Sequence, residues 1–505
     1  MSEKPVRVRF APSPTGPLHM GGVRTALYNY LFAKKNNGTF VIRIEDTDQT
    51  RFVPGAQEYI MESLKWCGIM PTEGPGLGGD FGPYIQSERK AMYKPYAEEL
   101  VEKGHAYYAF DTPEELDTVR EQAKAMGMPS WQYNGVTRMS LKNSLTLPAD
   151  EVKQKIENGD PYVIRMKMPR NKDVRFEDMI RGWVVVNTNN LDDKVLFKSD
   201  GMPTYHLANI VDDYTMKISH VIRGEEWLPS APLHVMLYEA FGWEAPQFAH
   251  LPLLLRPDGN GKLSKRDGDR LGFPVFPLEW KTSEGEIYSG YREKGYFPEA
   301  FINMLAFLGW NPGTNQEIFS LDELTEAFTI NRVAKAGAKF DAEKTKWYQQ
   351  NYLRTTSDDK LAEMLSEKTE GVAKERLTKI ADLMKERATF VEDILKEGGY
   401  LLSVPTKFDE KTLKKKWKDN TADIMYEWLT EIKKIESFNA ATIENAFKTF
   451  LEHKGLGIGA FLPNFRLLIT GIGMGPSMFE ISEFLGKEEV VQRIETGLEK
   501  VLALK

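Results

Sequence analysis

One histidine and two glycines follow a short apolar stretch near the start of the chain. The segment RFAPSPTGPLHMGGVRTALYNYL, residues 9–31, passes through proline and glycine, presents His19, Gly21 and Gly22, and then becomes amphipathic. Free backbone N–H groups and the helix dipole favour an anion where a helix begins. Glycine lets a flat ring or a phosphate approach the backbone, and His19 can donate a hydrogen bond. These residues indicate a phosphate or nucleotide site, with a capped glycine turn as the structural alternative.

The same turn does not match a Walker A loop. Gly16 and Gly21 have the spacing of that motif, but Gly22 and Val23 stand where it needs Lys and then Ser or Thr. The P-loop interpretation therefore fails at the residues that bind phosphate and metal.

Positive charge is concentrated in a second stretch, HLPLLLRPDGNGKLSKRDG, residues 250–268. An apolar run leads into an Asp-Gly-Asn-Gly turn, which is followed by Lys262, Ser264, Lys265 and Arg266. We expect a mobile, exposed loop here, because Asp, Asn and Gly favour turns. A basic loop that can close suits a triphosphate that releases pyrophosphate, although a basic loop alone is usually only solvated.

The elements around these stretches predict an α/β sheet. Up to about residue 330, strand-like runs such as TFVIRIED and KISHVIRG alternate with helical ones such as GAQEYIMESLKWCG. Such alternation predicts a largely parallel sheet with ligands at the carboxyl ends of its strands. The Met and aromatic residues of MIRGWVVVN, 179–187, are expected in the core. After about residue 335 the strand signals vanish, which predicts a separate all-helical half.

Composition excludes several other classes of protein. The 505 residues are 41% hydrophobic and 28% charged, with a net charge of −7, as is usual for a globular protein of several domains. No apolar run is long enough for a membrane span or a signal segment, so we expect a cytoplasmic protein without membrane association. Cys67 is the only cysteine and the seven histidines show no metal-ligand spacing. We therefore expect no disulfide and no metal site.

HMGG and KLSKR resemble the HIGH and KMSKS signatures of class I aminoacyl-tRNA synthetases. With RFAPSPTGPLHMGG, VIRIEDTD, SDGMPTYHLANIVDD and HVIRGEEW, they resemble glutamyl-tRNA synthetases of the bacterial type over essentially the whole chain. The resemblance implies that ATP, with Mg²⁺, converts L-glutamate to glutamyl-adenylate and pyrophosphate. Glutamate then passes to the 3′-terminal adenosine of tRNA(Glu). A monomer is the family default, and whether tRNA(Gln) is also charged stays open.

The resemblance also assigns candidate site residues. The catalytic residues would be His19, Lys262 and Lys265, and the ATP site would comprise His19, Gly21, Gly22, Glu226, Ser264 and Lys265. The glutamate pocket would comprise Arg9, Ala11, Ser13, Glu45, Tyr205, Asn209 and Arg223, and the tRNA contacts would include Asp48 and Arg387. The chemistry is consistent, because a dicarboxylate substrate needs fixed guanidinium groups and Glu45 suits the substrate ammonium.

Five segments follow from the same resemblance. Residues 1–105 and 195–255 would form the two halves of a Rossmann-like catalytic domain, and 106–194 an inserted α+β domain for the tRNA acceptor end. Residues 256–330 would hold the KLSKR loop, an insertion and a connecting region. Residues 331–505 would form the all-helical anticodon-binding half, expected as two subdomains.

The chain departs from the family at two places. GHAYYAFDTPEELD, residues 104–117, has His105 but no cysteine where many members bind zinc, so no zinc is expected. The insertion at residues 267–290 is longer and more aromatic than usual, and it could pack on the phosphate loop, contact tRNA or only decorate the surface. A basic cluster, KTLKKKWKDN at 411–420, is interpreted as a solvated helix face, with nucleic-acid contact as the alternative.

Rival functions fit less of the chain. A small-molecule nucleotidyltransferase would not need the helical half, and a tRNA-binding protein without activity would not need the phosphate loop. The shortened relative that glutamylates a tRNA base lacks the anticodon-binding half, and glutaminyl enzymes have a different sequence at APSPTG.

Overall fold

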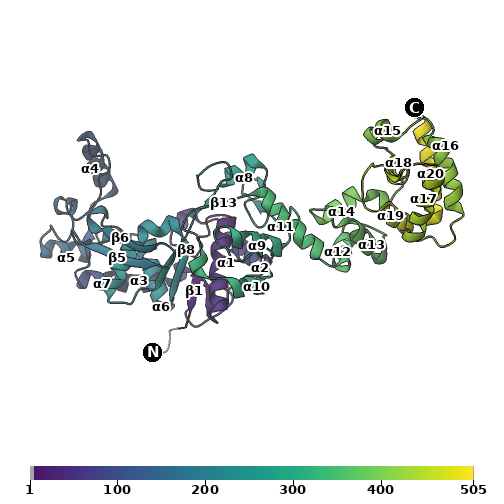
Figure 1. The fold of residues 1–505 in the computed structure, drawn as a ribbon. Helices are drawn as coiled ribbons and strands as arrows, with labels where there is room; N and C mark the ends of the chain where they lie inside the picture. Colours follow the sequence, from purple (N-terminus) through teal and green to yellow (C-terminus); the bar gives the residue numbers. More distant parts are fainter. Residues whose placement is uncertain (1–4, 504–505) are drawn as a thin grey trace. The chain divides into compact units, whose positions relative to one another are not determined.

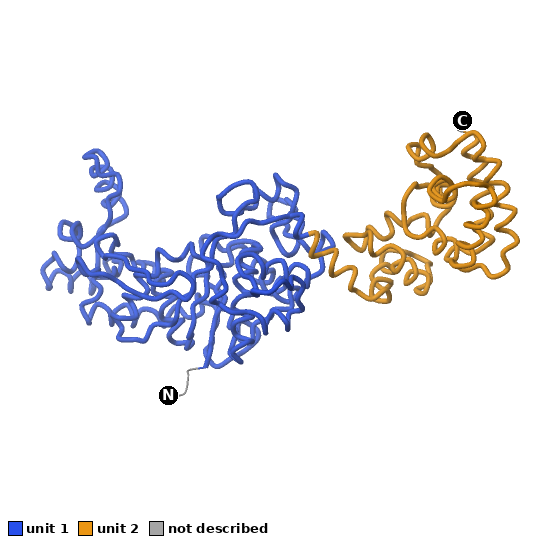
Figure 2. Tube along the Cα trace, in the orientation of Figure 1, with its two compact units in different colours: residues 1–345 blue, residues 346–505 orange. Residues whose placement is uncertain are grey.

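The computed structural model describes residues 5–503, which divide into two compact units, residues 1–345 and 346–505 (Figures 1 and 2). All strands among the described residues lie in the first unit, and the second unit is helical. The fold class is therefore as predicted: a Rossmann-like sheet followed by a helical half. The finer division into five segments stays a prediction.

A six-stranded sheet forms the centre of the first unit. Its order is β2 (Thr39–Ile42), β1 (Arg7–Phe10), β8 (His220–Gly224), β9 (Gln247–Leu251), β5 (Asp173–Asp178) and β6 (Gly182–Asn187). Neighbouring strands are parallel from β2 to β5, and β6 is an antiparallel edge strand. The chain goes from β1 to β2 on one side and later returns to β8 on the other. Such a reversal leaves a crevice at the carboxyl ends of β1 and β8, where ligands bind in this kind of sheet.

Helices of this unit lie between strands of this sheet in the chain, among them α1 (Met20–Lys35), α2 (Ala56–Trp66), α3 (Lys90–Glu102), α6 (Tyr205–Thr215) and α7 (Ala231–Phe241). The helices α8 (Lys265–Leu271), α9 (Pro298–Phe307) and α10 (Leu321–Ala327) follow its last strand (Figure 1). Helix α1 is buried on most of its faces, including Arg24, which donates to the carbonyls of Leu308 and Pro252. A helix fixed in this way holds the turn at its own N-terminus in place.

A three-stranded sheet of β3 (Ala106–Ala109), β4 (Val163–Met166) and β7 (Val195–Phe197) lies beside α4 (Pro113–Ala125) and α5 (Ala149–Glu157). Its small core contains Tyr107 and Tyr133. The Tyr107 hydroxyl donates to the buried Asp193 at 2.7 Å. This region includes residues 104–117, where the sequence has no cysteine to bind zinc. Aromatic packing and hydrogen bonds hold it together.

The expectation that Trp183 lies in the core is wrong, because this residue is 70% exposed. Val185, on the same strand, is 53% exposed. The reason is the position of β6 at the sheet edge, where alternate side chains face solvent.

Two pairings of two-residue strands complete the described strands of the first unit. β10 (Leu254–Leu255) pairs with β13 (Ala338–Lys339), and β11 (Trp280–Lys281) pairs with β12 (Ile287–Tyr288). β13 lies where the sequence indicated only helices, because a strand of two residues has no detectable periodicity.

The helical unit packs around aromatic residues. Helix α11 (Ala342–Thr355) leads into α12 (Asp358–Ser366), α13 (Lys374–Met384), α14 (Val391–Glu397), α15 (Glu410–Lys416), α16 (Thr421–Lys433), α17 (Ala440–His453), α18 (Ile458–Thr470), α19 (Met478–Leu485) and α20 (Lys487–Ala503). Trp428 is fully buried and its ring lies 5.0 Å from that of Phe447. Among the described residues, no helix combines the length and apolar character needed to cross a membrane.

Candidate active site

The turn between β1 and α1 presents a neutral imidazole. His19 is the N-cap of α1, and its Nδ1 accepts a hydrogen bond from the Gly21 N–H at 3.2 Å. Because Nδ1 accepts, the ring proton is assigned to Nε2. Burial, and then the charge of Lys262, lower the pKa of His19 to about 4. The Nε2 atom is buried and has no partner among the described residues, so it can donate to a ligand.

The two glycines of this turn differ in their surroundings. A Cβ on Gly21 would meet only ordinary contacts, the nearest being His19 Nδ1 at 3.6 Å. A Cβ on Gly22 would lie 2.5 Å from Leu18 Cδ1. Gly22 is therefore needed for the packing of Leu18, while Gly21 leaves open backbone at the cavity.

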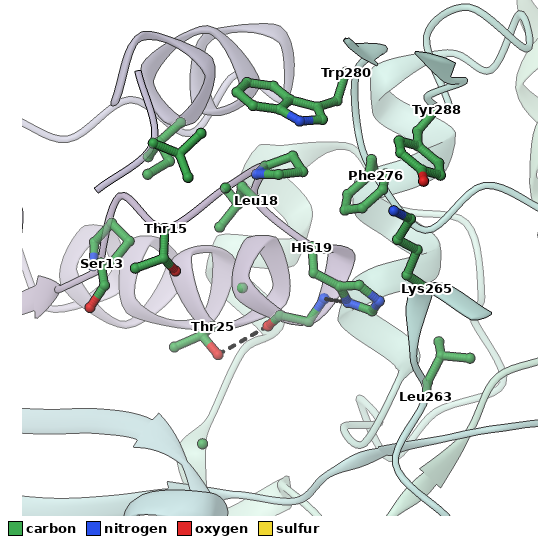
Figure 3. Close-up of a pocket in the computed structure, with 18 of the residues that line it drawn as sticks. Ser13, Thr15, Leu18, His19, Thr25, Leu263, Lys265, Phe276, Trp280 and Tyr288 are labelled. Carbon is green, nitrogen blue, oxygen red and sulfur yellow. Dashed lines mark hydrogen bonds between the residues drawn. The ribbon is translucent and has the colours of Figure 1, made fainter. Parts of the chain in front are cut away.

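A cavity of about 1160 Å³ brings the predicted phosphate residues together (Figure 3). Six of them line it: His19, Gly21, Gly22, Glu226, Lys262 and Lys265. Lys262 Nζ lies 2.9 Å from Glu226 Oε1, and this ammonium keeps the pKa of Glu226 low although burial opposes it. Lys265 Nζ lies 3.3 Å from the centre of the Tyr288 ring. Both lysines and the imidazole thus face one space.

The KLSKR segment is more ordered than the sequence suggested. Helix α8 begins at Lys265, with Ser264 as its N-cap and the Ser264 hydroxyl donating to Asp267 Oδ2 at 2.6 Å. The expectation of a loop through Arg266 is wrong. The overlooked signal is a capping box, Ser264-Lys-Arg-Asp267, which marks a helix start. Ser264 does not line the cavity and instead sets the direction of Lys265.

The insertion at residues 267–290 lies against the same cavity. Met20 N–H donates to the Val275 carbonyl at 2.8 Å. The Phe276 ring stands edge-on to His19, with centres 6.1 Å apart. Of the three alternatives left open by the sequence, packing on the phosphate side is therefore the one observed. Composition alone could not place this segment, because its aromatic residues suit a core as well as a cavity wall.

A second cavity, of about 260 Å³, gathers every residue predicted for the glutamate pocket. These residues come from β1 and the segment after it, the segment after β2, α6 and β8: Arg9, Ala11, Ser13, Glu45, Tyr205, Asn209 and Arg223. The two cavities share Ser13, Gly21, Gly22 and Glu226. A small amino acid and a nucleotide could therefore meet at this shared wall.

Buried ion pairs hold one side of the second cavity. Arg9 donates to Asp213 through Nε at 3.0 Å and Nη2 at 3.2 Å, and Arg43 Nη1 donates to the same carboxylate at 2.7 Å. Arg43 Nη2 also donates to Glu45 Oε1 at 2.8 Å. Burial raises the pKa of Glu45 against the opposing charge of Arg43. Asp213 and Arg43, which sequence reasoning missed, thus fix both predicted ligand-binding groups.

A second set of contacts orients Arg223. Its Nε donates to His250 Nε2 at 3.1 Å, and its Nη1 donates to the Tyr205 hydroxyl at 3.0 Å. His250 Nδ1 lies 2.6 Å from Asp178 Oδ2, so the proton is assigned to Nδ1 and Nε2 is free to accept. Burial lowers the pKa of His250. No spacing in the sequence links these residues, because 72 positions separate His250 from Asp178.

The predicted tRNA contacts lie outside both cavities. Asp48 is exposed and pairs with Arg51 at 2.8 Å. Arg387, in the helical unit, donates to the Gly475 carbonyl at 2.9 Å and borders a pocket of about 460 Å³. In the basic cluster, Trp417 is buried and Lys415 is exposed, so the tryptophan belongs to the core.

Family comparison decides the class of protein. Residues 5–347 match the family described as tRNA synthetases class I (E and Q), catalytic domain. The chain belongs to this family. It is an aminoacyl-tRNA synthetase, an ATP-dependent ligase, and the resemblance seen in the sequence is confirmed. Residues 360–498 match an anticodon binding domain, which places tRNA binding in the helical unit of the synthetase.

Relatives match the synthetase along its whole length. The Glutamate--tRNA ligase of Flavobacterium johnsoniae is 58% identical, over 98% of this chain and 99% of that one. The Glutamate--tRNA ligase of Cytophaga hutchinsonii is 54% identical, over 98% of both chains. A crystal structure of a glutamate tRNA ligase from Elizabethkingia meningosepticum, in complex with its amino acid, has a TM-score of 0.95 and 53% identity, covering 99% of this chain and 100% of that one.

Proposed function

We propose that the synthetase is a glutamate–tRNA ligase that activates L-glutamate with ATP and transfers it to the 3′-terminal adenosine of tRNA(Glu). The observation that carries the proposal is the second cavity, where two guanidinium groups and one carboxylate meet beside the His19 and Lys265 cavity. A dicarboxylate with one ammonium group matches this set of charges. The names of the full-length relatives support the same substrate.

Activation needs positioning and charge stabilisation more than a protein nucleophile. An oxygen of the glutamate α-carboxylate attacks the α-phosphorus of ATP, and the bond to the bridging oxygen of pyrophosphate breaks. In this proposal the Nε2–H of His19 donates to a phosphate oxygen, and Lys262 and Lys265 stabilise the charge of the leaving pyrophosphate. Glu226 holds the ribose or adenine side, Ser264 positions Lys265, and Gly21 leaves room for the adenosine.

In the second cavity, Arg223 and Arg9 would bind the two carboxylates of glutamate. Glu45, held by Arg43 and Asn209, would accept hydrogen bonds from the ammonium. Tyr205, Ala11 and Ser13 would complete the pocket. In the second step the terminal ribose hydroxyl attacks the carbonyl carbon of the adenylate, and AMP leaves.

Mg²⁺ is proposed to accompany the triphosphate. Among residues 5–503, no group of three His, Cys, Asp or Glu side chains is placed to hold a metal ion. An ion that ATP brings in would neutralise phosphate charge. The absence of zinc, the monomeric state and the cytoplasmic location expected from the sequence stay predictions.

The helical unit is proposed to read the anticodon, with Arg387 at a base edge or phosphate and Asp48 near the bound tRNA in the first unit. A guanidinium suits either target, because it presents paired donors in one plane. The printed names of the relatives support charging of tRNA(Glu) and say nothing of tRNA(Gln).

ATP–pyrophosphate exchange tests the proposal. It should be measured with glutamate and with glutamine, each with and without total tRNA. Exchange with glutamate only, appearing when tRNA is added, is the expected result. Exchange without tRNA would instead indicate the activation mode of the shortened base-modifying relative, and no exchange would overturn the proposal. Charging of separately purified tRNA(Glu) and tRNA(Gln) then shows whether the enzyme discriminates between them.

A further inference from the structure

We propose that Tyr288, in the insertion, is a positioning residue for Lys265: its ring holds the lysine ammonium inside the ATP cavity, where the ammonium can reach the triphosphate. The inference rests on the role proposed above for Lys265. It assigns the insertion a role in the reaction that cannot be read from the signatures HMGG and KLSKR, because Tyr288 lies outside both.

The contact itself is close. Lys265 Nζ lies 3.3 Å from the centre of the Tyr288 ring, where an ammonium meets the negative face of an aromatic system. Phe276 stands edge-on to Tyr288 at 6.1 Å and edge-on to His19 at 6.1 Å. Figure 3 shows Lys265 reaching toward Phe276 and Tyr288, with His19 beside them. The three rings therefore form one wall of the cavity, and the ammonium rests on it.

This wall is anchored to α2 as well as to α8. The Tyr59 hydroxyl, on α2, donates to the Leu278 carbonyl at 2.6 Å and accepts from the Leu278 N–H at 3.2 Å. Trp280 stands edge-on to the Tyr59 ring at 5.2 Å. Where the chain leaves the hairpin after β12, a Cβ on Gly290 would lie 2.2 Å from the Leu278 backbone. The ring of Tyr288 is thus a fixed point against which α8 places Lys265.

A ring is suited to this task because it attracts the ammonium without neutralising it. The neighbouring Glu226 is paired with Lys262, and Asp267 is occupied by Ser264 and Arg270. A carboxylate partner would compete with the phosphates of ATP for the Lys265 ammonium, because both are anions. The attraction of an aromatic face is weaker than a charge-assisted bond to phosphate. When ATP enters, the ammonium can donate to the triphosphate and keep one side against the ring.

The test is a double-mutant cycle on ATP–pyrophosphate exchange, with the full chain, tRNA and saturating glutamate. Tyr288→Leu should lower kcat/KM for ATP by about five- to thirtyfold, the range between an exposed and a desolvated cation–aromatic contact, because both residues are half-buried. Tyr288→Phe keeps the ring and should stay within about twofold of the wild type. The matched control is Ile287→Ala, because Ile287 is 60% exposed on the same hairpin and should leave the rate unchanged.

The second half of the cycle tests whether Tyr288 acts through Lys265 or only stabilises the fold. In a Lys265→Ala background, Tyr288→Leu should cause almost no further loss, because the partner of the ring is gone. An equal loss in both backgrounds would overturn the proposal, as would a wild-type or faster rate for Tyr288→Leu. A loss in Tyr288→Phe as large as in Tyr288→Leu would also overturn it, by placing the effect in the hydroxyl that donates to Glu286. A wild-type rate for Lys265→Ala alone would instead refute the role proposed for Lys265.

Discussion

Arg223 and His250 are joined by a hydrogen bond of 3.1 Å, in which a guanidinium Nε donates to a neutral imidazole. The arrangement works only while the imidazole keeps its proton on Nδ1, toward Asp178. The direction of Arg223 in the glutamate cavity thus depends on a carboxylate that does not line that cavity.

Asp178→Asn should therefore weaken glutamate use without touching ATP use. We expect KM for glutamate to rise about tenfold, because the hydrogen bond that fixes the His250 tautomer is lost. Steady-state exchange kinetics at varied glutamate and varied ATP measure this. Asp173→Asn, an exposed change on the same strand, is the control. Equal changes in the two KM values would contradict the positioning role of Asp178.

Removal of Arg223 itself should have a larger effect. In Arg223→Ala, kcat/KM for glutamate should fall by about 10- to 150-fold or more, the range for a hydrogen bond to a charged group. KM for ATP should change by less than about threefold. Arg175→Ala removes an exposed arginine and should leave both constants unchanged. Unaltered glutamate kinetics in Arg223→Ala would remove this residue from the pocket.

Lys265→Ala should slow activation and spare tRNA binding. The loss of one preorganised charge at the leaving group corresponds to about 10²- to 10³-fold in rate. Exchange rate and tRNA affinity, measured separately, give the two readouts. Arg266→Ala, an exposed change at the next position of α8, tests whether charge alone matters. If both variants lose activity to the same degree, a general basic surface and not Lys265 is responsible.

The basic cluster at residues 411–420 gives a prediction for the helical unit. If Lys415 and Lys416 contact tRNA phosphates, changing both to Ala should flatten the slope of log affinity against log salt by roughly 1 to 2. Filter binding between low and high salt measures the slope. Lys433→Ala with Lys434→Ala removes the same charge from lysines paired with Glu495 and Glu431. An unchanged slope in the first pair supports the solvated-face interpretation.

Stability should depend on pH through the buried histidines, among them His19 and His206. Burial lowers the pKa of His19 and of His206 to about 4, from 6.5. Between these values the unfolded chain binds protons that the folded chain does not, so stability is full above pH 6.5 and falls as the pH drops toward 4. His206→Asn should reduce the difference in protons bound near pH 5 by about one. Urea unfolding at pH 7.5 and 5 measures it, with exposed His105→Asn as the control.

The periodic parts of the fold could be predicted from sequence. The run TFVIRIED contains β2 and GAQEYIMESLKWCG contains α2. A short continuous apolar run indicates a buried strand, and apolar residues three and four positions apart indicate a helix with one buried face. β13 could not be predicted, since two residues carry no period. The exposure of Trp183 also could not, because a strand at the sheet edge and one inside it have similar compositions.

The site divides in the same way. Arg9, Glu45 and Arg223 were predicted because each belongs to a signature along the chain, and one cavity does bring them together. Asp178, His250 and Asp213 were missed because they act through side chains distant in sequence. Asp213 ends the stretch SDGMPTYHLANIVDD and His250 begins HLPLLLRPDGNGKLSKRDG, but neither stretch shows which side chain its residue contacts. The capping box at Ser264 was visible in the sequence, but the basic residues after it suggested a loop.

The excursion from Leu278 to Gly290 begins and ends at the same place, with the backbone of Leu278 against Gly290. A detour of this kind can lengthen or shorten in evolution without moving the strands and helices around it. It also gives the nucleotide cavity the rings of Trp280 and Tyr288. An inhibitor that contacts these two rings would lose both contacts in a synthetase with a shorter detour.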